Sequence, residues 1–375
     1  MTETSSRLNR RRLAWGAPAV AVIVVAAAVT VPMVASAAPS LPNRSAAQLL
    51  ADVAKSDGAA LSGTVVETAR LGLPALPDVS GTSISPTVLL AGSHTARVWY
   101  DGGNKARIAL VGSLAETDLV RNGRDVWFWT SGQNTAQHLR LPAASAQDRA
   151  SSPSPSPAQS LTPQQAAKQA IAAIDPTTKV TVDGTARVAG RSAYELVLQP
   201  RDKRSLIRDV RIAVDAKTSV PLRVQVHAAG ATGRPAFETA FTSISFAKPS
   251  SSVFRFSPPP GAKVTQSHLP AHPGSDVKHS ATQQGQGAKV IGTGWTAVVE
   301  LPGVSLPAGG GSRDGRGSST SAQLSTLRRA MTPVSGTFGT GQVLRTRLVT
   351  VLLLDDGRLL VGSVSPAVLE QAAAR

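Results

Sequence analysis

The sequence predicts a mainly β protein of the α+β class, with antiparallel strands, a few short helices and a small α+β unit at the end of the chain. Alternation of apolar and polar residues recurs in many short segments, such as "VRIAVD" and "LRVQVH", and is typical of half-buried strands. Turn dipeptides such as Asn122-Gly123 and Asp356-Gly357 separate several of these segments. Such dipeptides favour hairpins and therefore antiparallel pairing.

The composition narrows the class of protein. The chain has 375 residues, of which 42% are hydrophobic, and this is enough for two or three domains. It contains no cysteine, which excludes disulfide scaffolds, thiolate metal sites, cysteine nucleophiles and a lipidated N-terminal cysteine. The net charge of +16 favours an anionic partner such as a membrane surface or an acidic protein. Nucleic acid is not expected, because the basic residues are spread out and no recognition motif occurs.

Residues 1–37 have the layout of an export signal. Arg7, Arg10, Arg11 and Arg12 precede a long apolar run that ends at Ala35-Ser36-Ala37. We expect cleavage after Ala37 and an extracytoplasmic location, either periplasmic or at the cell surface. The apolar run is also long enough to remain as an N-terminal membrane anchor, and this alternative stays open.

The elements of the first folded unit follow in order. Ser45 and Gln48 have the spacing of a capping box and predict a helix over 45–57. A strand over 61–71 and a meander of short strands up to residue 141 come next. Residues 142–160 are a Ser/Pro-rich insertion. Thr162 as N-cap, Pro163 at the first helical position and Gln165 as capping-box partner then predict the start of a second helix, and closely spaced strands follow to residue 264.

The rest of the chain forms a linker and a smaller unit. Residues 265–290 are polar and read as a linker, and 303–320 read as a flexible Gly/Ser loop. The smaller unit comprises a strand over 291–303, a helix over 321–331, a hairpin that turns at Asp356-Gly357 and a helix that begins at Ser365-Pro366. Together these segments predict a small α+β domain over 291–375.

The stretch "DVWFWTSG" (125–132) is unusual in a chain that is only 4% aromatic. In an extended strand, Trp127 and Trp129 point to one face and Phe128 to the other. Both faces of this strand therefore need apolar cover. The rings either fill an ordinary core or line a cavity, and the residues alone leave both readings open.

Several segments resemble the family of the lipoprotein carrier LolA and the sigma-factor regulator RseB (MucB). The resemblance lies in "GRSAYELVLQPRDKRSLIRDVRIAVDAKTSVPLRVQV", "FETAFTSISF" and "FRFSPPPGAKV", and with the preceding elements it covers most of 42–264. It implies an unclosed antiparallel half-barrel, wrapped round short helices, whose concave face binds acyl chains. The segment "TRLVTVLLLDDGRLLVGSVSPAVLEQAA" looks like the small second domain of RseB-type regulators.

The resemblance also implies a set of site residues. The acyl-chain cavity is expected to be lined by Trp99, Tyr100, Trp127, Trp129, Val224 and Phe241. Arg97 and Arg124 are candidates for contact with lipid headgroups or an acidic partner, although charged strand residues more often form a solvated outer face.

The function implied is non-enzymatic binding in the bacterial cell envelope. We expect a LolA-like carrier of lipid or lipoprotein acyl chains or, as the alternative, an RseB-like regulator that controls an anti-sigma factor or other membrane partner. No cofactor is expected. No catalytic motif occurs, and "GTFGTG" at 336–341 reads as a turn. No metal site is expected at His268, His272 and His279, because the predicted linker cannot fix ligands.

Overall fold

The computed structural model describes residues 40–56, 58–73, 91–112, 115–141, 162–231, 233–268, 288–302 and 329–375. Several predictions lie outside these ranges. They concern the export segment 1–37, the insertion 142–160, most of the linker 265–290, the loop 303–320 and most of the helix 321–331.

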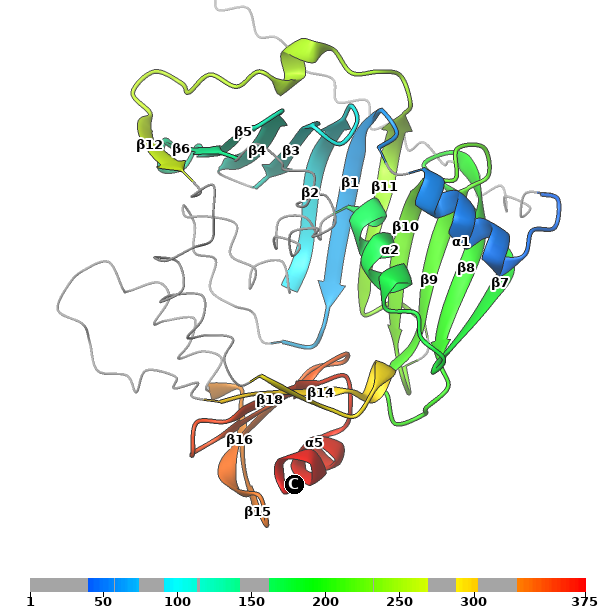
Figure 1. Ribbon diagram of the computed structural model, residues 1–375, viewed down its shortest axis with the longest axis vertical. Helices are drawn as coiled ribbons and strands as arrows, with labels where there is room; N and C mark the ends of the chain where they lie inside the picture. Colours follow the sequence, from blue (N-terminus) through cyan, green and yellow to red (C-terminus); the bar gives the residue numbers. More distant parts are fainter. Residues whose placement is uncertain are drawn as a thin grey trace, which may run out of the picture. The chain divides into compact units, whose positions relative to one another are not determined.

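One large sheet of twelve strands dominates the described chain (Figure 1). Its strands are β1 (Leu61–Arg70), β2 (Ala91–Tyr100), β3 (Lys105–Val111), β4 (Glu116–Asn122), β5 (Asp125–Thr130), β6 (Thr135–Arg140), β7 (Thr178–Val188), β8 (Arg191–Pro200), β9 (Ile207–Asp215), β10 (Pro221–Ala228), β11 (Phe237–Ser245) and β12 (Lys263–His268).

The strand order is β12-β6-β5-β4-β3-β2-β1-β11-β10-β9-β8-β7. Two sequential meanders, β1 to β6 and β7 to β11, are thus joined where β1 pairs with β11. Because β7 and β12 are the two edges, the sheet is not closed into a barrel, and the predicted unclosed antiparallel half-barrel is confirmed. The sequence did not predict the pairing of β12, which runs parallel to β6.

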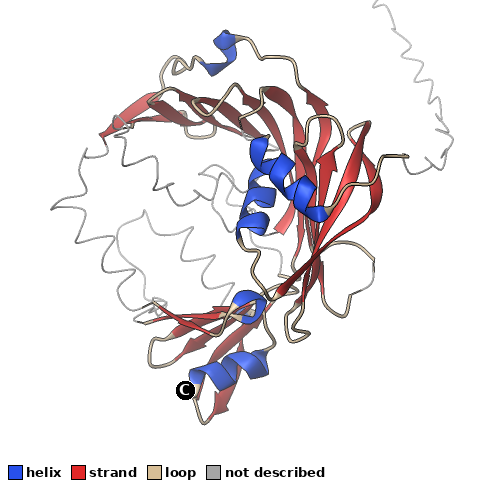
Figure 2. Ribbon diagram, turned by 45° about the vertical axis from the view of Figure 1, so that its right-hand side comes forward, coloured by secondary structure: helices blue, strands red, loops and turns tan. Residues whose placement is uncertain are grey.

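Two helices lie on one face of this sheet (Figure 2), which we call the helix face. Helix α1 (Ala46–Lys55) has the predicted capping box: the Ser45 hydroxyl accepts a hydrogen bond from the Gln48 backbone, and the Gln48 side chain accepts one from the Ser45 backbone. Helix α2 (Pro163–Ala172) begins after Thr162 as predicted. The predicted capping box there is wrong, because the Thr162 hydroxyl is buried beside that of Tyr100 and caps nothing.

The core under the helices is continuous. Leu49 of α1 and Ala167 of α2 are fully buried against Leu196, Leu198 and Ile212 of the sheet. Burying a side chain of leucine size contributes roughly 1.5–3 kcal/mol. This contact therefore holds both helices on the β7–β11 half of the sheet.

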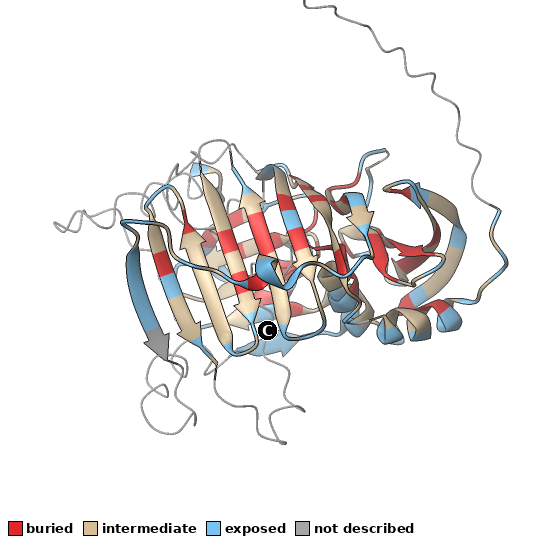
Figure 3. Cartoon of the chain, turned by 90° about the horizontal axis from the view of Figure 1, so that it is seen from above, coloured by how far each residue is buried: buried red, intermediate tan, exposed pale blue. Residues whose placement is uncertain are grey.

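The opposite face of the sheet is crossed by residues 246–262, which we call the strap (Figure 3). The strap leaves β11, forms a short 3-10 helix η3 (Ser251–Phe254) and leads into β12. Phe254 is only 1% exposed, and η3 contacts β3 and β4. The face beneath it is named the strap face.

A second sheet of six strands follows in the order β13-β14-β18-β17-β16-β15. Helix α5 (Pro366–Ala373) packs on it through the buried Leu369. The strands are β13 (Lys289–Ile291), β14 (Val298–Leu301), β15 (Thr332–Gly336), β16 (Gly339–Arg345), β17 (Thr350–Leu354) and β18 (Leu359–Gly362).

Two expectations about this unit have clear outcomes. The hairpin turns at "GTFGTG" and Asp356-Gly357 are confirmed. The single strand predicted over 291–303 is wrong, because the 3-10 helix η4 (Gly294–Thr296) separates β13 from β14. Within η4 the Trp295 indole donates a hydrogen bond to the Thr178 hydroxyl of β7 at 2.8 Å, which holds this turn against the large sheet.

Candidate functional site

Strand β5 divides its aromatic residues between the two faces of the large sheet. Cross-strand partners lie on the same face, so the register shows where each ring lies. Val224 is buried under the helices and pairs with Thr239, which pairs with Glu67, which in turn pairs with His94 of β2. His94 and Val98 share a face of β2, and from Val98 the pairs continue through Ile108 of β3 and Leu119 of β4 to Phe128 of β5. Phe128 therefore lies on the helix face, and Trp127 and Trp129 lie on the strap face, with the alternation that the sequence predicts.

The rings on the strap face form a packed layer. Trp127 stacks on His138 with ring centroids 4.2 Å apart, and Phe256 of the strap lies 5.3 Å from Trp127 and 6.2 Å from Trp129. The imidazole of His138 in turn lies 2.9 Å from the Asp125 carboxylate. These contacts hold the strap against β5 and β6.

An arginine fixes the strap from the neighbouring strand β3. Arg107 forms an ion pair with the buried Asp118 at 2.5 Å and donates a hydrogen bond to the Val253 carbonyl at 3.5 Å. Its guanidinium also lies 5.6 Å from the centre of the Trp99 ring. The strap face of β2 to β6 is thus occupied by contacts within the protein.

The helix face of β2 to β6 is different. Its central row runs from Val98 through Ile108 and Leu119 to Phe128, and Leu119 and Phe128 are only partly buried. The main contacts of α1 and α2 are with β7, β10 and β11. Among the described residues, this half of the helix face therefore has apolar side chains without a covering helix. The apolar residues on it are Ala96, Val98, Ala106, Ile108, Leu110, Leu119, Val126, Phe128 and Leu139.

Two ionisable groups are buried on the same face. Glu67 is 3% exposed, and burial raises the pKa of its carboxyl to about 7. Its cross-strand partners are His94 and Thr239. Burial likewise raises the pKa of Tyr100 to about 12, against an opposing effect of the Thr162 hydroxyl. The sequence analysis did not select Glu67, although its alternation with Val65 and Ala69 places a carboxyl on an apolar face.

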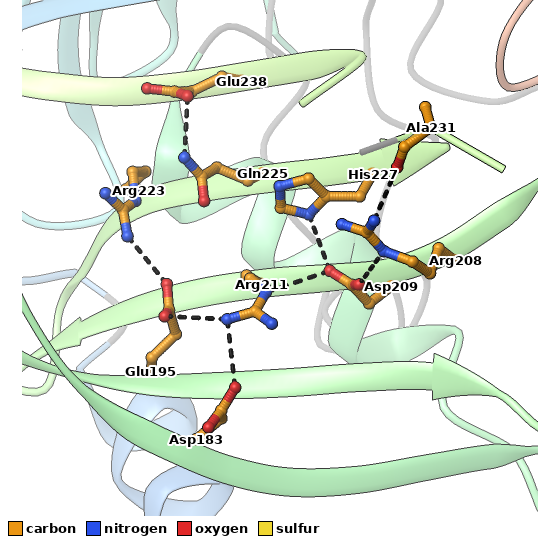
Figure 4. A network of polar contacts seen from close by, with 10 residues as sticks. All are labelled: Asp183, Glu195, Arg208, Asp209, Arg211, Arg223, Gln225, His227, Ala231 and Glu238. Carbon is orange, nitrogen blue, oxygen red and sulfur yellow. Dashed lines mark hydrogen bonds and ion pairs between the residues drawn. The ribbon is translucent and has the colours of Figure 1, made fainter. Parts of the chain in front are cut away.

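On the other half of the sheet, the strap face carries a network of ion pairs (Figure 4). Arg211 reaches Asp183 and Glu195, both at 3.3 Å, and Asp209 at 3.2 Å. Glu195 also accepts a hydrogen bond from Arg223 at 2.8 Å. Because these carboxylates all have a cationic partner, the network ties four strands, β7 to β10, together.

Asp209 is the most buried acid of this network. Burial alone raises the pKa of its carboxyl, but the hydrogen bond from Arg208 and the charge and hydrogen bond of His227 outweigh that effect and hold the pKa below its ordinary value. The His227 ring nitrogen lies 2.8 Å from the carboxylate. This arrangement stabilises the sheet and leaves the carboxylate fully engaged.

A half-open cavity of about 920 Å³ lies at the other end of this half, between residues 41–44, α1 and the turns that follow β7 and β9. Arg44, Lys55, Arg191 and Lys217 line it together with two carboxylates, Asp52 and Asp215. The sequence analysis did not identify this cavity, because its walls come from three segments that only the fold brings together.

No metal centre is evident within the residues that the structure describes, since no three His, Cys, Asp or Glu side chains group there as metal ligands do. His268 lies on β12, and His272 and His279 fall outside the described ranges. The helices of the described ranges include none that is both long and apolar enough to cross a bilayer.

Comparison with protein families identifies the central part of the chain. The family model described as the MucB/RseB N-terminal domain matches residues 93–271. This part of the chain is therefore similar to the MucB/RseB N-terminal domain family. The matched residues include β3 to β12, almost all of β2, and the strap. No curated protein matches the sequence.

The chain is similar to solved structures of proteins from several bacteria. The MucA/MucB complex of Pseudomonas aeruginosa is 15% identical over 88% of this chain and 96% of that chain, with a TM-score of 0.41. An uncharacterised conserved protein of Thermus thermophilus is 14% identical over 59% and 99%, with a TM-score of 0.33. A LolA superfamily protein of Nitrosomonas europaea is 10% identical over 57% and 99%, with a TM-score of 0.22.

The residues predicted to line an acyl-chain cavity do not share one surface. Tyr100, Val224 and Phe241 lie on the helix face, where Val224 and Phe241 are each only 2% exposed. Trp99, Trp127 and Trp129 lie together on the strap face. The register of β2 explains this separation, because Trp99 and Tyr100 are adjacent and must point to opposite faces. Contact of either group with a ligand stays a prediction.

The two arginines predicted as headgroup or partner contacts are also separated. Arg97 is exposed on the strap face of β2. Arg124 lies in the turn between β4 and β5, where its Nε donates a hydrogen bond to the Leu141 carbonyl at 2.8 Å. Neither lies on the apolar half of the helix face.

Proposed function

We propose that this protein is exported to the bacterial cell envelope and binds the acyl chains of a lipid or lipoprotein, without catalysis, on the helix face of β2 to β6. One observation carries the proposal: the apolar row from Val98 to Phe128 continues beyond the helices and ends in partly exposed side chains. An acyl chain is held by burial of apolar area, at roughly 25 cal/mol per Å². Such binding needs no cofactor and no covalent step.

The match of residues 93–271 to the MucB/RseB model favours a regulator over a carrier. In this role the half-barrel over 42–264 senses a lipid or lipoprotein, and the unit over 291–375 takes part in control of a membrane partner such as an anti-sigma factor. The net charge of +16 suits work at an anionic membrane surface.

The binding proposal is tested by native mass spectrometry with organic extraction of the protein purified from a lysate that contains membranes. We expect a co-purifying lipid or acylated peptide, and we expect the variant Phe128→Ser to lose most of it. Val111→Ser is the matched control, because Val111 is 47% exposed and lies on the strap face of the same half of the sheet. Equal lipid content in both variants, or a protein that stays empty with added lipid, would overturn the proposal.

The regulatory role has a separate test. The protein is crosslinked in membranes with and without added lysolipid, and its captured partners are identified. Capture of one integral membrane protein, released by the lipid, supports regulation. Transfer of lipid between two vesicle populations without such a partner would instead establish the carrier role.

A further inference from the structure

We propose that the cavity beside α1 binds a phosphate ester, either a small phosphorylated molecule or the headgroup of a phospholipid. At about 920 Å³ the cavity lies in the size range of small-molecule sites. It is separate from the apolar row that ends at Phe128, so this inference does not rest on the proposed function.

The charge of the lining favours an anion. Four basic side chains face two carboxylates, and both carboxylates are already paired. Asp52 is 2.9 Å from Arg44, and Asp215 accepts two hydrogen bonds from Arg191, at 2.6 and 2.8 Å. The cavity thus retains a surplus of positive charge.

The surplus comes from Lys55 and Lys217. Both are exposed at the cavity and have no acidic partner in the part of the chain that the structure describes. A lysine ammonium binds phosphate as a compact point charge with three donors. The lysines stand on different elements, α1 and the turn after β9, and both line the cavity.

Several side chains that line the cavity are fixed by contacts within the protein. The ring of Tyr194 is 4% exposed, and its hydroxyl donates a hydrogen bond to the Pro42 carbonyl at 2.9 Å. The Arg44 guanidinium lies 5.4 Å from the centre of this ring. The Arg191–Asp215 pair also lines the cavity, and Asp215 is further held by the Thr218 hydroxyl at 2.8 Å. The lining also includes the apolar residues Leu41, Pro42, Ala51 and Ala216, so an ester that carries carbon atoms next to its phosphate fits the cavity better than a bare ion does.

The test measures binding of two soluble probes to the full chain by isothermal titration calorimetry: dihexanoylphosphatidylglycerol below its critical micelle concentration, and inorganic phosphate. The variant Lys55→Gln/Lys217→Gln is compared with Lys179→Gln/Lys289→Gln, which removes the same charge at exposed lysines outside the cavity. We expect the cavity variant to weaken binding about fivefold or more, as two charge contacts imply, and the control to stay within twofold.

The two probes separate the sources of the phosphate. If inorganic phosphate shows the same pattern as the lipid, the phosphate group alone is recognised. If only the lipid does, the headgroup with its glycerol is the ligand. The proposal is overturned if neither probe binds, or if the cavity and control variants weaken binding equally. A lipid that binds only at the apolar row would give this last result.

Discussion

The two halves of the large sheet have the same alternation of side chains between two faces, but they differ in which face is covered by other parts of the protein. In the β7–β11 half, the helix face is covered by α1 and α2 and the strap face carries ion pairs. In the β1–β6 half, the strap face is covered by η3 and aromatic contacts, while the helix face has apolar residues beyond the main contacts of the helices. The helices therefore cover the helix face of the β7–β11 half, whereas the strap covers the strap face of the β1–β6 half. One half has both faces engaged within the protein, and the other has partly exposed apolar side chains on its helix face.

The strap is the first feature with which to test this comparison. Phe254→Ala removes a ring that is 1% exposed, and we expect it to lower the free energy of unfolding by about 3–5 kcal/mol. Urea unfolding measures this, and a red shift of tryptophan fluorescence reports the loosening over Trp127 and Trp129. Val264→Ala, at a side chain that is 46% exposed, is the control. A loss below about 1 kcal/mol would show that the strap is not part of the core.

The helix face can be compared directly between the halves. Ile212→Ala, at a fully buried site under the helices, is expected to cost about 2–5 kcal/mol. Phe128→Ala, at a partly buried site, should cost less than half as much in the lipid-free protein although it removes more carbon. Chemical unfolding of both variants measures the two losses in free energy of unfolding. Equal losses would show that Phe128 belongs to an ordinary hydrophobic core.

Glu67 offers a test by pH. The folded protein holds a proton on this carboxyl up to a pKa of about 7, and the unfolded chain only up to the ordinary pKa of 4.5. Stability due to this group is therefore present at low pH and is lost as pH rises from 4.5 to 7. We expect Glu67→Gln to remove this dependence and to gain about 2–3 kcal/mol at about pH 8. Glu370→Gln on α5 controls for the loss of one charge, and an unchanged pH profile for Glu67→Gln would contradict the assignment.

Asp209 gives the opposite pH dependence with a smaller expected effect. Its folded pKa lies below the ordinary value of 3.8, so its contribution is present above that value and is lost as pH falls through the folded pKa. At about pH 7, Asp209→Asn should cost about 1–3 kcal/mol and flatten the acid limb of the stability curve. Asp183→Asn, in the same network but with a side chain 64% exposed, should cost less than about 0.5 kcal/mol. Similar losses for the two variants would mean that burial does not matter in this network.

The sequence predicted what depends on near neighbours in the chain. The capping box of Ser45, the meander of β2 to β6 and the division of Trp127 and Phe128 between two faces all follow from local spacing, and all are confirmed. Thr162 had the same local pattern, but its hydroxyl lies beside Tyr100, a residue distant in sequence. At Thr162, the contact with Tyr100 therefore replaced the helix cap that the local spacing predicted.

The candidate site was harder to predict for the same reason. The strap face of the β1–β6 half is covered because Phe254 and Phe256 pack against strands more than a hundred residues earlier in the chain. The hydrophobic periodicity of the sequence does not predict such long-range contacts. The cavity beside α1 likewise depends on how a helix meets two turns. Glu67 was the exception, because a carboxyl in step with Val65 and Ala69 is visible in the sequence itself.

The joining of the two meanders has a consequence for how the protein folds. Strand β1 ends at Arg70 but pairs with β11, which begins only at Phe237, and β6, which ends at Arg140, pairs with β12, which begins only at Lys263. An intermediate that contains only the first meander therefore has two open strand edges, and such edges pair readily with other chains. Closure of these distant pairs should be the slow step of refolding, and aggregation should compete with it most strongly until β11 docks.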